Sequence, residues 1–256
     1  MKYFVDKTDN RNILLSNLFR DRQKQDVFWF NENDLEKIEE GDCIIFSPAK
    51  KFVDGYFLKF PNNIKIVCGN LSDVNIKILQ DKNIEYHNLM LDEIFAIKNA
   101  NLTAEGVLAI MLKESPRSMY KNNILILGGG RIALALSIVF SKLNLKFSIV
   151  SYNNVKFPKY YLIADKCFYK ESYFDNLSDY DVVINTIPNK IIPDNMLDKF
   201  QNKCLFIETA SVECLNKELV KNFTYFNAPA LPSKFSVETA AELMYESIMG
   251  ENKYED

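Results

Sequence analysis

An apolar run that ends in three consecutive glycines constrains the fold of this chain more than any other feature. Asn123–Leu127 is typical of a buried strand, Gly128-Gly129-Gly130 of a tight turn, and Ile132–Leu143 of an apolar helix. A strand, a turn and a helix in this order form the first part of a βαβ unit, so the sequence predicts a parallel sheet covered by helices. The next apolar run, Phe147–Ser151, follows at the distance that such a crossover requires.

The glycines also predict what this turn binds. Gly128, Gly130 and Ala133 match the G-x-G-x-x-G/A spacing. The first residue permits the turn, the second lets the backbone approach a pyrophosphate, and the third lets the helix pack close to the strand. The N–H groups and the dipole at the start of the helix favour an anion. We therefore predict a dinucleotide-binding turn formed by Gly128, Gly129, Gly130, Arg131 and Ile132.

Short apolar strands alternate with helical patterns along the whole chain, which is the signature of an α/β fold. The predicted strands are 2–6, 26–31, 42–47, 64–68 and 84–87, and then 124–127, 147–151, 166–168, 181–186, 204–209 and 224–227. We expect two lobes, an N-terminal flavodoxin-like lobe and a C-terminal Rossmann domain with a doubly wound parallel sheet. The expected parts are an N-terminal lobe at 1–100, a crossover helix and hinge at 101–120, the Rossmann domain at 121–232, and a C-terminal helix at 233–256 that packs back on the N-terminal lobe.

Two helical segments have boundaries that the sequence predicts. Asn101–Glu114 predicts a helix that opens at Thr103, with the negative charge of Glu105 in its first turn. Ser115–Ser118 contains a proline that breaks this helix, which makes it the candidate hinge. Asn33–Glu40 predicts a shorter helix in the N-terminal lobe.

The end of the strand Phe147–Ser151 bears on the choice between NAD and NADP. NAD-binding domains usually carry an acidic residue here, which holds the ribose hydroxyls. This chain has Ser151-Tyr152-Asn153 instead, and Arg131 and Lys156 are cations that suit a 2′-phosphate. We therefore predict NADP as the cofactor, with NAD as the alternative, and Ser151, Tyr152 and Asn153 as cofactor-binding residues.

Two later stretches carry further candidates. A buried strand ends in Asn185-Thr186-Ile187-Pro188, at the carboxyl edge of the sheet where ligands of open α/β folds bind. We predict that these four residues contact the cofactor, with Asn185 and Thr186 on the nicotinamide side. The stretch Ala228–Lys234 contains two prolines that make a rigid linker, and Lys234 is a candidate to face an anionic substrate.

Composition and charge exclude several classes of function. The net charge of −3, with both signs interspersed, opposes nucleic-acid binding, which depends on clustered Lys and Arg. No apolar stretch approaches the roughly 20 residues that span a bilayer. Met1 leads directly into a short apolar run and then into charged residues, so we expect no signal peptide. These patterns predict a cytoplasmic protein that binds neither nucleic acid nor membrane.

The cysteines and the single histidine complete the inventory of reactive groups. Cys43, Cys68 and Cys204 lie in or beside apolar runs and are predicted to be core residues, whereas Cys214 is a candidate exposed thiol. With only His87 available, a His-based metal site or catalytic triad is not expected.

Taken together, these motifs resemble the family formed by the A subunit of bacterial dipicolinate synthase, most clearly from about residue 100 to 248. The resemblance rests on the order and spacing of Asn101–Gly106, Leu127–Arg131, Ile184–Pro188, Ala228–Pro232 and Thr239-Ala240. It implies NADP-linked oxidation of dihydrodipicolinate to dipicolinate during sporulation, with a flavoprotein-like B subunit as partner. A small dicarboxylate substrate would call for cations, such as Lys234, Arg131 and one of Lys50 and Lys51. The substrate candidates are Ser47, Thr103, Glu105, Ala228, Leu231 and Lys234, and we also expect an oligomer.

The chain departs from the family pattern at several positions. Ala230 and Ser233 stand where glycines are expected, Glu238 where a lysine is expected, and Tyr152 where a basic residue is expected. Val212-Glu213-Cys214 replaces a glycine-rich stretch.

Two other functions therefore stay open beside the oxidoreductase. One is a non-catalytic dinucleotide-binding partner or regulatory subunit. The other is a dehydrogenase similar in layout to shikimate or hydroxyacid dehydrogenases, which is disfavoured because the sequence shows no Lys–Asp catalytic pair.

Overall fold

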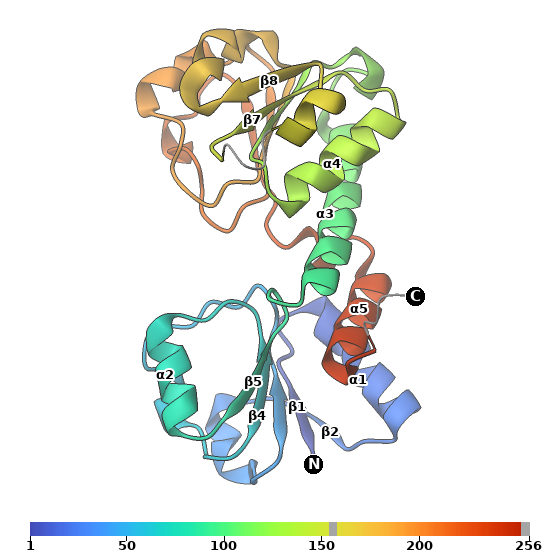
Figure 1. Ribbon diagram of the computed structural model, residues 1–256, viewed down its shortest axis with the longest axis vertical. Helices are drawn as coiled ribbons and strands as arrows, with labels where there is room; N and C mark the ends of the chain where they lie inside the picture. Colours follow the sequence, from blue (N-terminus) through green and yellow to red (C-terminus); the bar gives the residue numbers. More distant parts are fainter. Residues whose placement is uncertain (154–157, 252–256) are drawn as a thin grey trace. The chain divides into compact units, whose positions relative to one another are not determined.

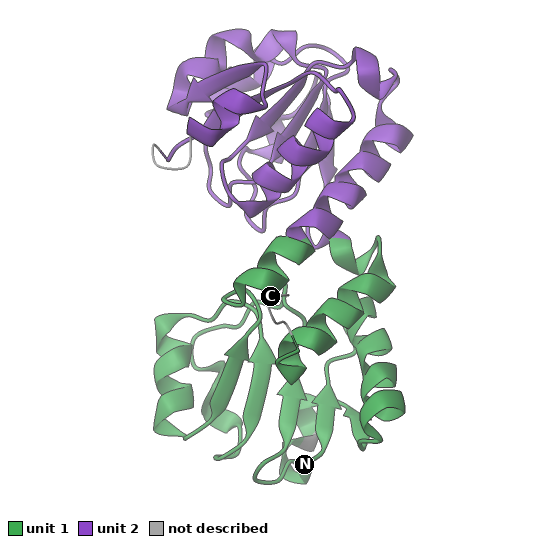
Figure 2. Cartoon of the chain, turned by 45° about the vertical axis from the view of Figure 1, so that its right-hand side comes forward, with its two compact units in different colours: residues 1–99, 232–256 green, residues 100–231 purple. Residues whose placement is uncertain are grey.

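The computed structural model describes residues 1–153 and 158–251, which form two compact units (Figures 1 and 2). Unit 1 combines residues 1–99 with the C-terminal segment from residue 232, and unit 2 consists of residues 100–231. The chain crosses from one unit to the other at residues 99–100, inside helix α3 (Glu93–Glu114), and again at residues 231–232. The stretch Ser115–Ser118, which we expected to be a hinge, lies inside unit 2.

Unit 1 contains a five-stranded, all-parallel sheet in the order β2-β1-β3-β4-β5. Its strands are β1 (Tyr3–Val5), β2 (Val27–Trp29), β3 (Cys43–Ile45), β4 (Lys65–Cys68) and β5 (Glu85–Asn88). The order reverses between β1 and β3, which is the flavodoxin-like arrangement expected from the sequence. The short strands are buried at β1 and β3 on both faces, which explains why their sequences are apolar throughout.

Helices cover both faces of this sheet. The helices of unit 1 are α1 (Asn10–Gln23), α2 (Asp73–Asp81) and α5 (Val237–Met249), with 3₁₀ turns at Glu32–Lys37 and Tyr56–Lys59. On one face, Phe19 of α1 stacks on Tyr3 and contacts Tyr245 of α5, with ring centroids 4.3 and 5.3 Å apart. On the other face, Leu79 of α2 joins a core that includes Phe4 and Ile44. Figure 1 shows α2 on the side of the sheet opposite to α1 and α5.

Unit 2 contains a six-stranded, all-parallel sheet in the order β11-β10-β9-β6-β7-β8. Its strands are β6 (Ile124–Leu127), β7 (Phe147–Ser151), β8 (Lys166–Tyr169), β9 (Val182–Asn185), β10 (Leu205–Glu208) and β11 (Thr224–Asn227). This is the doubly wound order of a Rossmann fold, and it confirms the predicted fold class. The register pairs Leu127 with Asn185 and Asn185 with Glu208, so the last residues of β6, β9 and β10 lie side by side at the carboxyl edge.

Only one connection between the described strands of unit 2 is an α-helix. Helix α4 (Arg131–Lys142) joins β6 to β7, whereas the connections between the later strands use 3₁₀ turns at Pro158–Leu162, Lys170–Asp179, Asp194–Lys199 and Lys217–Leu219. Two further 3₁₀ turns, Met119–Lys121 and Leu231–Ser233, precede β6 and follow β11. Tyr173 and Leu177 from the turn after β8 pack with Leu125 and Phe206 of the sheet in one buried cluster. Figure 1 shows α3 and α4 next to each other in this unit.

Two predicted helix boundaries are wrong. Helix α3 begins at Glu93 rather than at Thr103. The side chain of Asp92 caps it there, because it accepts a 3.0 Å hydrogen bond from the backbone N–H of Phe95. Glu105 therefore lies in the middle of the helix, on its exposed side. The helix predicted at 33–40 is only the 3₁₀ turn Glu32–Lys37.

Helix α3 is also the one described helix that is long and apolar enough to pass a test for a membrane span by length and composition. Within its most apolar stretch, 56% of the residues are buried. Ala104 and Val107 are fully buried in unit 2, as in the core helix of a folded domain.

Candidate functional site

The three glycines of the predicted turn experience three different environments in unit 2. Gly128 has φ +129°, and a Cβ on it would stand 2.1 Å from Oγ1 of Thr186. A Cβ on Gly129 would stand 2.6 Å from Oγ of Ser151. Around Gly130 a Cβ would meet nothing within 4 Å. The fold itself therefore requires the first glycine and crowds the second, whereas the third faces open space.

Gly130 is the N-cap of helix α4, and several backbone N–H groups at this end of the helix are free to bind a ligand. Its φ of −87° is open to any residue, and no side chain caps the helix. Within the described residues, the backbone N–H groups of Gly129, Gly130 and Ile132 donate no hydrogen bond to the protein. Free donors at a helix N-terminus, next to a residue without a side chain, favour an anion such as a phosphate group.

The turn lies at the point where the strand order of unit 2 reverses. β6 is flanked by β9 on one side and β7 on the other, and ligands of open α/β sheets bind at the carboxyl edge next to such a reversal. Thr186, directly after β9, donates a 2.9 Å hydrogen bond from Oγ1 to the carbonyl oxygen of Leu127. The loop after β9 is thereby attached to the start of the glycine turn.

The predicted cofactor residues after β9 do not all face outward. Asn185 is fully buried, and its Nδ2 donates to the carbonyl oxygen of Ile187 at 2.9 Å and to Oε1 of Glu208 at 2.7 Å. Its Oδ1 accepts a 3.1 Å hydrogen bond from the N–H of Ile187. The side chain of Asn185 is thus occupied in holding this loop, while Thr186 and Ile187 are half-buried and Pro188 is exposed.

Glu208, at the end of β10, is the residue of this site that the sequence analysis missed. It is fully buried and accepts hydrogen bonds from Asn185 Nδ2, from Ala210 N at 3.1 Å and from Cys214 N at 2.9 Å. Burial raises the pKa of Glu208, while these donors act in the opposite direction. A single carboxylate at the end of the apolar run Leu205–Ile207 was the signal that could have found it.

The expectation that Cys214 is an exposed thiol is wrong. Its side chain is fully buried, and burial, with the nearby carboxylate of Glu208, raises the pKa of the thiol well above its usual range. The N–H of Cys214 donates a hydrogen bond to the Glu208 carboxylate, which holds the loop after β10 against the end of that strand. The predicted core positions of Cys43, Cys68 and Cys204 are confirmed by their burial.

The three predicted cofactor-binding residues at the end of β7, Ser151, Tyr152 and Asn153, lie in different environments. Ser151 is buried, and its Oγ exchanges hydrogen bonds of 3.2 Å with the backbone of Asn153. The ring of Tyr152 packs against the buried cluster around Tyr173, and Asn153 is exposed. Lys156, proposed as a cation for a 2′-phosphate, lies outside the described residues, whereas Arg131 is exposed at the start of α4.

The substrate candidates are divided between the two units. In unit 2, Thr103, Ala228 and Leu231 are buried and Glu105 is exposed. In unit 1, Ser47 is buried and Lys234 is exposed.

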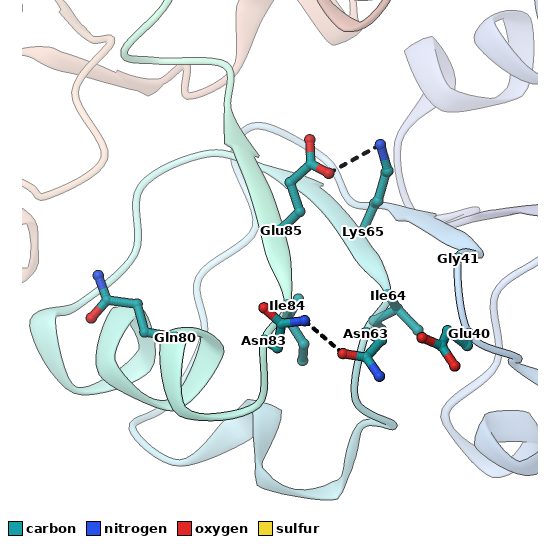
Figure 3. A pocket seen from close by; sticks show the side chains of 9 residues that line it. All are labelled: Glu40, Gly41, Asn63, Ile64, Lys65, Gln80, Asn83, Ile84 and Glu85. Atoms are coloured by element: carbon teal, nitrogen blue, oxygen red, sulfur yellow. Dashed lines mark hydrogen bonds and ion pairs between the residues drawn. The ribbon is translucent and has the colours of Figure 1, made fainter.

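Two grooves lie at the amino ends of strands, away from these carboxyl edges. One, of about 510 Å³, surrounds the entries to β3, β4 and β5, where Lys65 pairs with Glu85 at 3.0 Å and Asn83 bonds Asn63 at 2.7 Å (Figure 3). The other, of about 290 Å³, lies at the entries to β6, β9 and β10. Ligands of open α/β sheets bind at the carboxyl ends of strands, so we do not assign the site to either groove.

Comparison with known proteins agrees with the motifs. No protein-family model matches the chain. Over 155 residues the chain is 22% identical to the A subunit of dipicolinate synthase from Bacillus subtilis, covering 58% of this chain and 51% of that protein, so the match spans about half the length of the relative. The crystal structure of the same subunit from Bacillus halodurans superposes with a TM-score of 0.79 at 18% identity, covering 97% of both chains. The chain resembles the A subunit of dipicolinate synthase.

This resemblance to the dipicolinate synthase A subunit confirms the one inferred from the motifs, and it extends over the whole fold. The corresponding structure from Bacillus subtilis gives a TM-score of 0.80 at 18% identity, covering 98% of this chain and 95% of that chain. An NAD-dependent formate dehydrogenase from Staphylococcus aureus, solved with NAD, gives 0.62 at 11% identity, covering 100% and 98%. The architecture is thus shared by the dipicolinate synthase A subunit and by NAD-dependent dehydrogenases.

Proposed function

We propose that this protein is an NADP-dependent oxidoreductase of the dipicolinate synthase type, which oxidises dihydrodipicolinate to dipicolinate during sporulation. The observation that carries the proposal is the open backbone of Gly130. The backbone N–H groups of Gly129, Gly130 and Ile132 have no acceptor in the described protein, they lie at the start of helix α4 at the switch point of a Rossmann sheet, and a Cβ on Gly130 would meet nothing within 4 Å. An anionic diphosphate is the ligand that this geometry suits.

The residues present fit a nicotinamide dinucleotide. Gly129, Gly130 and Ile132 would hold the pyrophosphate by backbone N–H groups, and the exposed Arg131 would favour a 2′-phosphate. Thr186 and Ile187, on the loop held by Asn185, would contact the cofactor from β9. A bound oxidised nicotinamide supplies a hydride acceptor. Loss of the hydride makes the product ring aromatic, which favours the reaction. The protein therefore has chiefly to hold the substrate in the correct orientation next to the nicotinamide.

The remaining parts of the proposal follow from the relatives. The name of the similar protein denotes one of the subunits of a synthase, so a second, flavoprotein-like subunit is the proposed partner. We further propose a cytoplasmic, oligomeric protein whose substrate is a small dicarboxylate.

The dinucleotide assignment is tested by calorimetric titration of NADP⁺ and NAD⁺ into the wild type, Gly130→Asp and Gly130→Ala. Open space at Gly130 lets both variants fold, which circular dichroism checks. The aspartate should repel the phosphates and abolish binding, while alanine should weaken it less. Binding of NADP⁺ to Gly130→Asp with unchanged affinity would show that the diphosphate lies elsewhere.

The enzymatic assignment needs a separate assay. The full chain, with NADP⁺, freshly prepared dihydrodipicolinate and a candidate B subunit, should produce absorbance of NADPH. The departures at Glu238 and Ala230 make the non-catalytic subunit the second candidate. NADP⁺ binding without turnover under every partner condition would favour that regulatory role.

A further inference from the structure

Unit 1 has a topological switch point of its own, between β1 and β3. In sheets of the order 2-1-3-4-5, ligands bind outside the carboxyl ends of the strands on either side of this reversal. Asp6 and Asp9 follow β1 directly, and Ser47 and Lys50 follow β3. Ser47 bonds Asp9 across 38 positions of the sequence and Lys50 bonds Asp6 across 44, and the N–H of Lys50 donates to the carbonyl oxygen of Ser47, so the four residues form one hydrogen-bonded group.

The inner part of this group is a closed ion pair. Arg11 donates to Asp9 from Nε at 3.0 Å and from Nη2 at 2.7 Å, and Ser47 Oγ donates to Asp9 at 2.5 Å. Burial of Asp9 opposes its ionisation, but the hydrogen bonds and charge of Arg11, with the bond from Ser47, outweigh it and hold the pKa of Asp9 below its usual value. With 2% of its side chain exposed, Arg11 serves Asp9 rather than a ligand.

The outer part of the group is a pair between Lys50 and Asp6. Lys50 Nζ lies 3.0 Å from Asp6 Oδ2, with side-chain exposures of 24% and 5%. Asp6 also accepts a 3.0 Å hydrogen bond from the N–H of Thr8. An ammonium group has three N–H donors, and in the described chain the Lys50 ammonium has a hydrogen bond only to Asp6, so two donors remain for another acceptor.

The position of Lys50 is defined by its backbone and by the rings around it. The N–H of Lys50 donates to the carbonyl oxygen of Ser47 at 3.0 Å, which closes a turn over Pro48. That turn rests against Gly69 after β4, where a Cβ would stand 2.0 Å from the carbonyl oxygen of Pro48. The ring centroid of Phe46 lies 4.8 Å from Lys50 Nζ. A cation held by a turn, a ring and a buried carboxylate is preorganised to bind.

We propose that the switch point of unit 1 is a carboxylate-binding site, in which Lys50 Nζ binds a carboxylate of the substrate and Asp6 is the residue that positions it. The inference rests on the proposed function, since it assigns the dicarboxylate substrate to these residues. Asn12, which is fully buried, donates a 2.8 Å hydrogen bond from Nδ2 to the backbone carbonyl oxygen of Asp6 and so fixes the backbone at the end of β1.

The site is tested by calorimetric titration of the full chain with pyridine-2,6-dicarboxylate, with and without NADP⁺. Lys50→Met should lower the affinity about tenfold or more, the loss expected for one charge-assisted contact of ~1.4 kcal/mol. Lys50→Arg, which keeps the cation, should retain most of the affinity. The control is Lys59→Met, which removes a lysine of the same unit that is also paired with a carboxylate, Glu32, and should leave binding unchanged. Pyridine-2-carboxylate and inorganic phosphate, used as competitors, separate recognition of the dicarboxylate from general anion binding.

A double variant separates ligand binding from a purely structural role of Lys50. Lys50→Met alone leaves the buried Asp6 carboxylate without its cation and should lower the thermal midpoint. Asp6→Asn combined with Lys50→Met removes that unpaired charge, so stability should return while the affinity stays low. Recovery of wild-type affinity in the double variant would overturn the proposal, because Lys50 would then stabilise the protein without contacting the ligand.

The outcome for the wild type distinguishes this inference from the proposed function. A wild type that binds NADP⁺ but none of the pyridine carboxylates, with or without cofactor, overturns the carboxylate site and leaves the dinucleotide assignment standing. A wild type that binds pyridine-2,6-dicarboxylate in a Lys50-dependent way, yet binds no dinucleotide, overturns the proposed function and keeps the site.

Discussion

Oγ1 of Thr186 occupies the position next to Gly128 where a side chain would otherwise begin, 2.1 Å from an ideal Cβ. The same oxygen donates to the carbonyl of Leu127, the residue before the turn. Two loops that are nearly 60 residues apart in sequence therefore meet at one atom, and the carboxyl ends of β6 and β9 share a single rigid junction. The open site at Gly130 is built on this junction.

Gly128→Ala should destabilise unit 2 strongly. The variant places a methyl group on Thr186 Oγ1 and forces an L-residue into φ +129°, which should cost about 2–4 kcal/mol in the free energy of unfolding. Urea denaturation followed by circular dichroism measures the change. Gly130→Ala is the matched control and should cost less than about 1 kcal/mol, because only a glycine N-cap is lost, its φ is ordinary and its surroundings are open. Equal losses in both variants would contradict the assigned geometry.

Glu208→Ala should destabilise the carboxyl edge of unit 2. It leaves Asn185 Nδ2 and the N–H groups of Ala210 and Cys214 without their acceptor, and we expect a loss of about 3 kcal/mol in the free energy of unfolding. Glu208→Gln keeps one acceptor oxygen and should lose less. The exposed Glu218→Ala serves as control. NADP⁺ affinity should fall with Glu208→Ala, because the Asn185 loop loses its anchor; unchanged affinity and stability together would remove Glu208 from this role.

Ala230→Gly should stabilise the protein. Ala230 has φ +54°, a left-handed conformation that glycine adopts without the penalty that a Cβ imposes. We expect a gain of roughly 1 kcal/mol in the free energy of unfolding, measured by thermal and urea denaturation. Ala228→Gly, at a buried position two residues earlier, should instead destabilise. A loss of stability in Ala230→Gly would mean that the methyl group contributes packing that exceeds the strain.

His87 should make the stability of unit 1 sensitive to mildly acidic pH. Its Nε2 lies 3.0 Å from Oγ of Ser247, which in turn donates to Asp92 at 2.6 Å. Burial lowers the pKa of His87 below 6.5, although Asp92 and Glu85 act against this. The unfolded chain therefore binds the proton more readily, so the contribution of neutral His87 is present above about pH 6.5 and is lost as the pH falls through the lower folded-state pKa.

The measurement for His87 is the difference between wild type and His87→Gln. The free energy of unfolding of the wild type should fall relative to the variant as the pH is lowered below about 6.5, since glutamine does not titrate. The difference removes the contribution of Glu208, whose raised pKa has the opposite sign. Parallel curves for the two proteins across this range would show that His87 is not buried as described.

Local sequence patterns were enough to predict much of the fold. The bounds of β6, β7 and β11 are the ones that the sequence predicts, and the glycine turn lies where its spacing places it. Each of these signals is contained in a short stretch, because an apolar strand, a glycine with positive φ and a helix start depend on neighbouring residues. The start of α3 was missed, although Asp92 was a local cap, because the more conspicuous Thr103 lies in the same apolar helix.

The sequence alone determined the fold class and the place of the glycine turn, because periodicity and glycine spacing act over a few residues. Only the tertiary structure decided which polar residues act together. Strand order and register bring Lys50 next to Asp6, where they form an ion pair, and Glu208 next to Asn185, where they share a hydrogen bond. They also bury Cys214. A polar side chain in a sequence has no partner until the strands are ordered, and burial then makes that partner necessary.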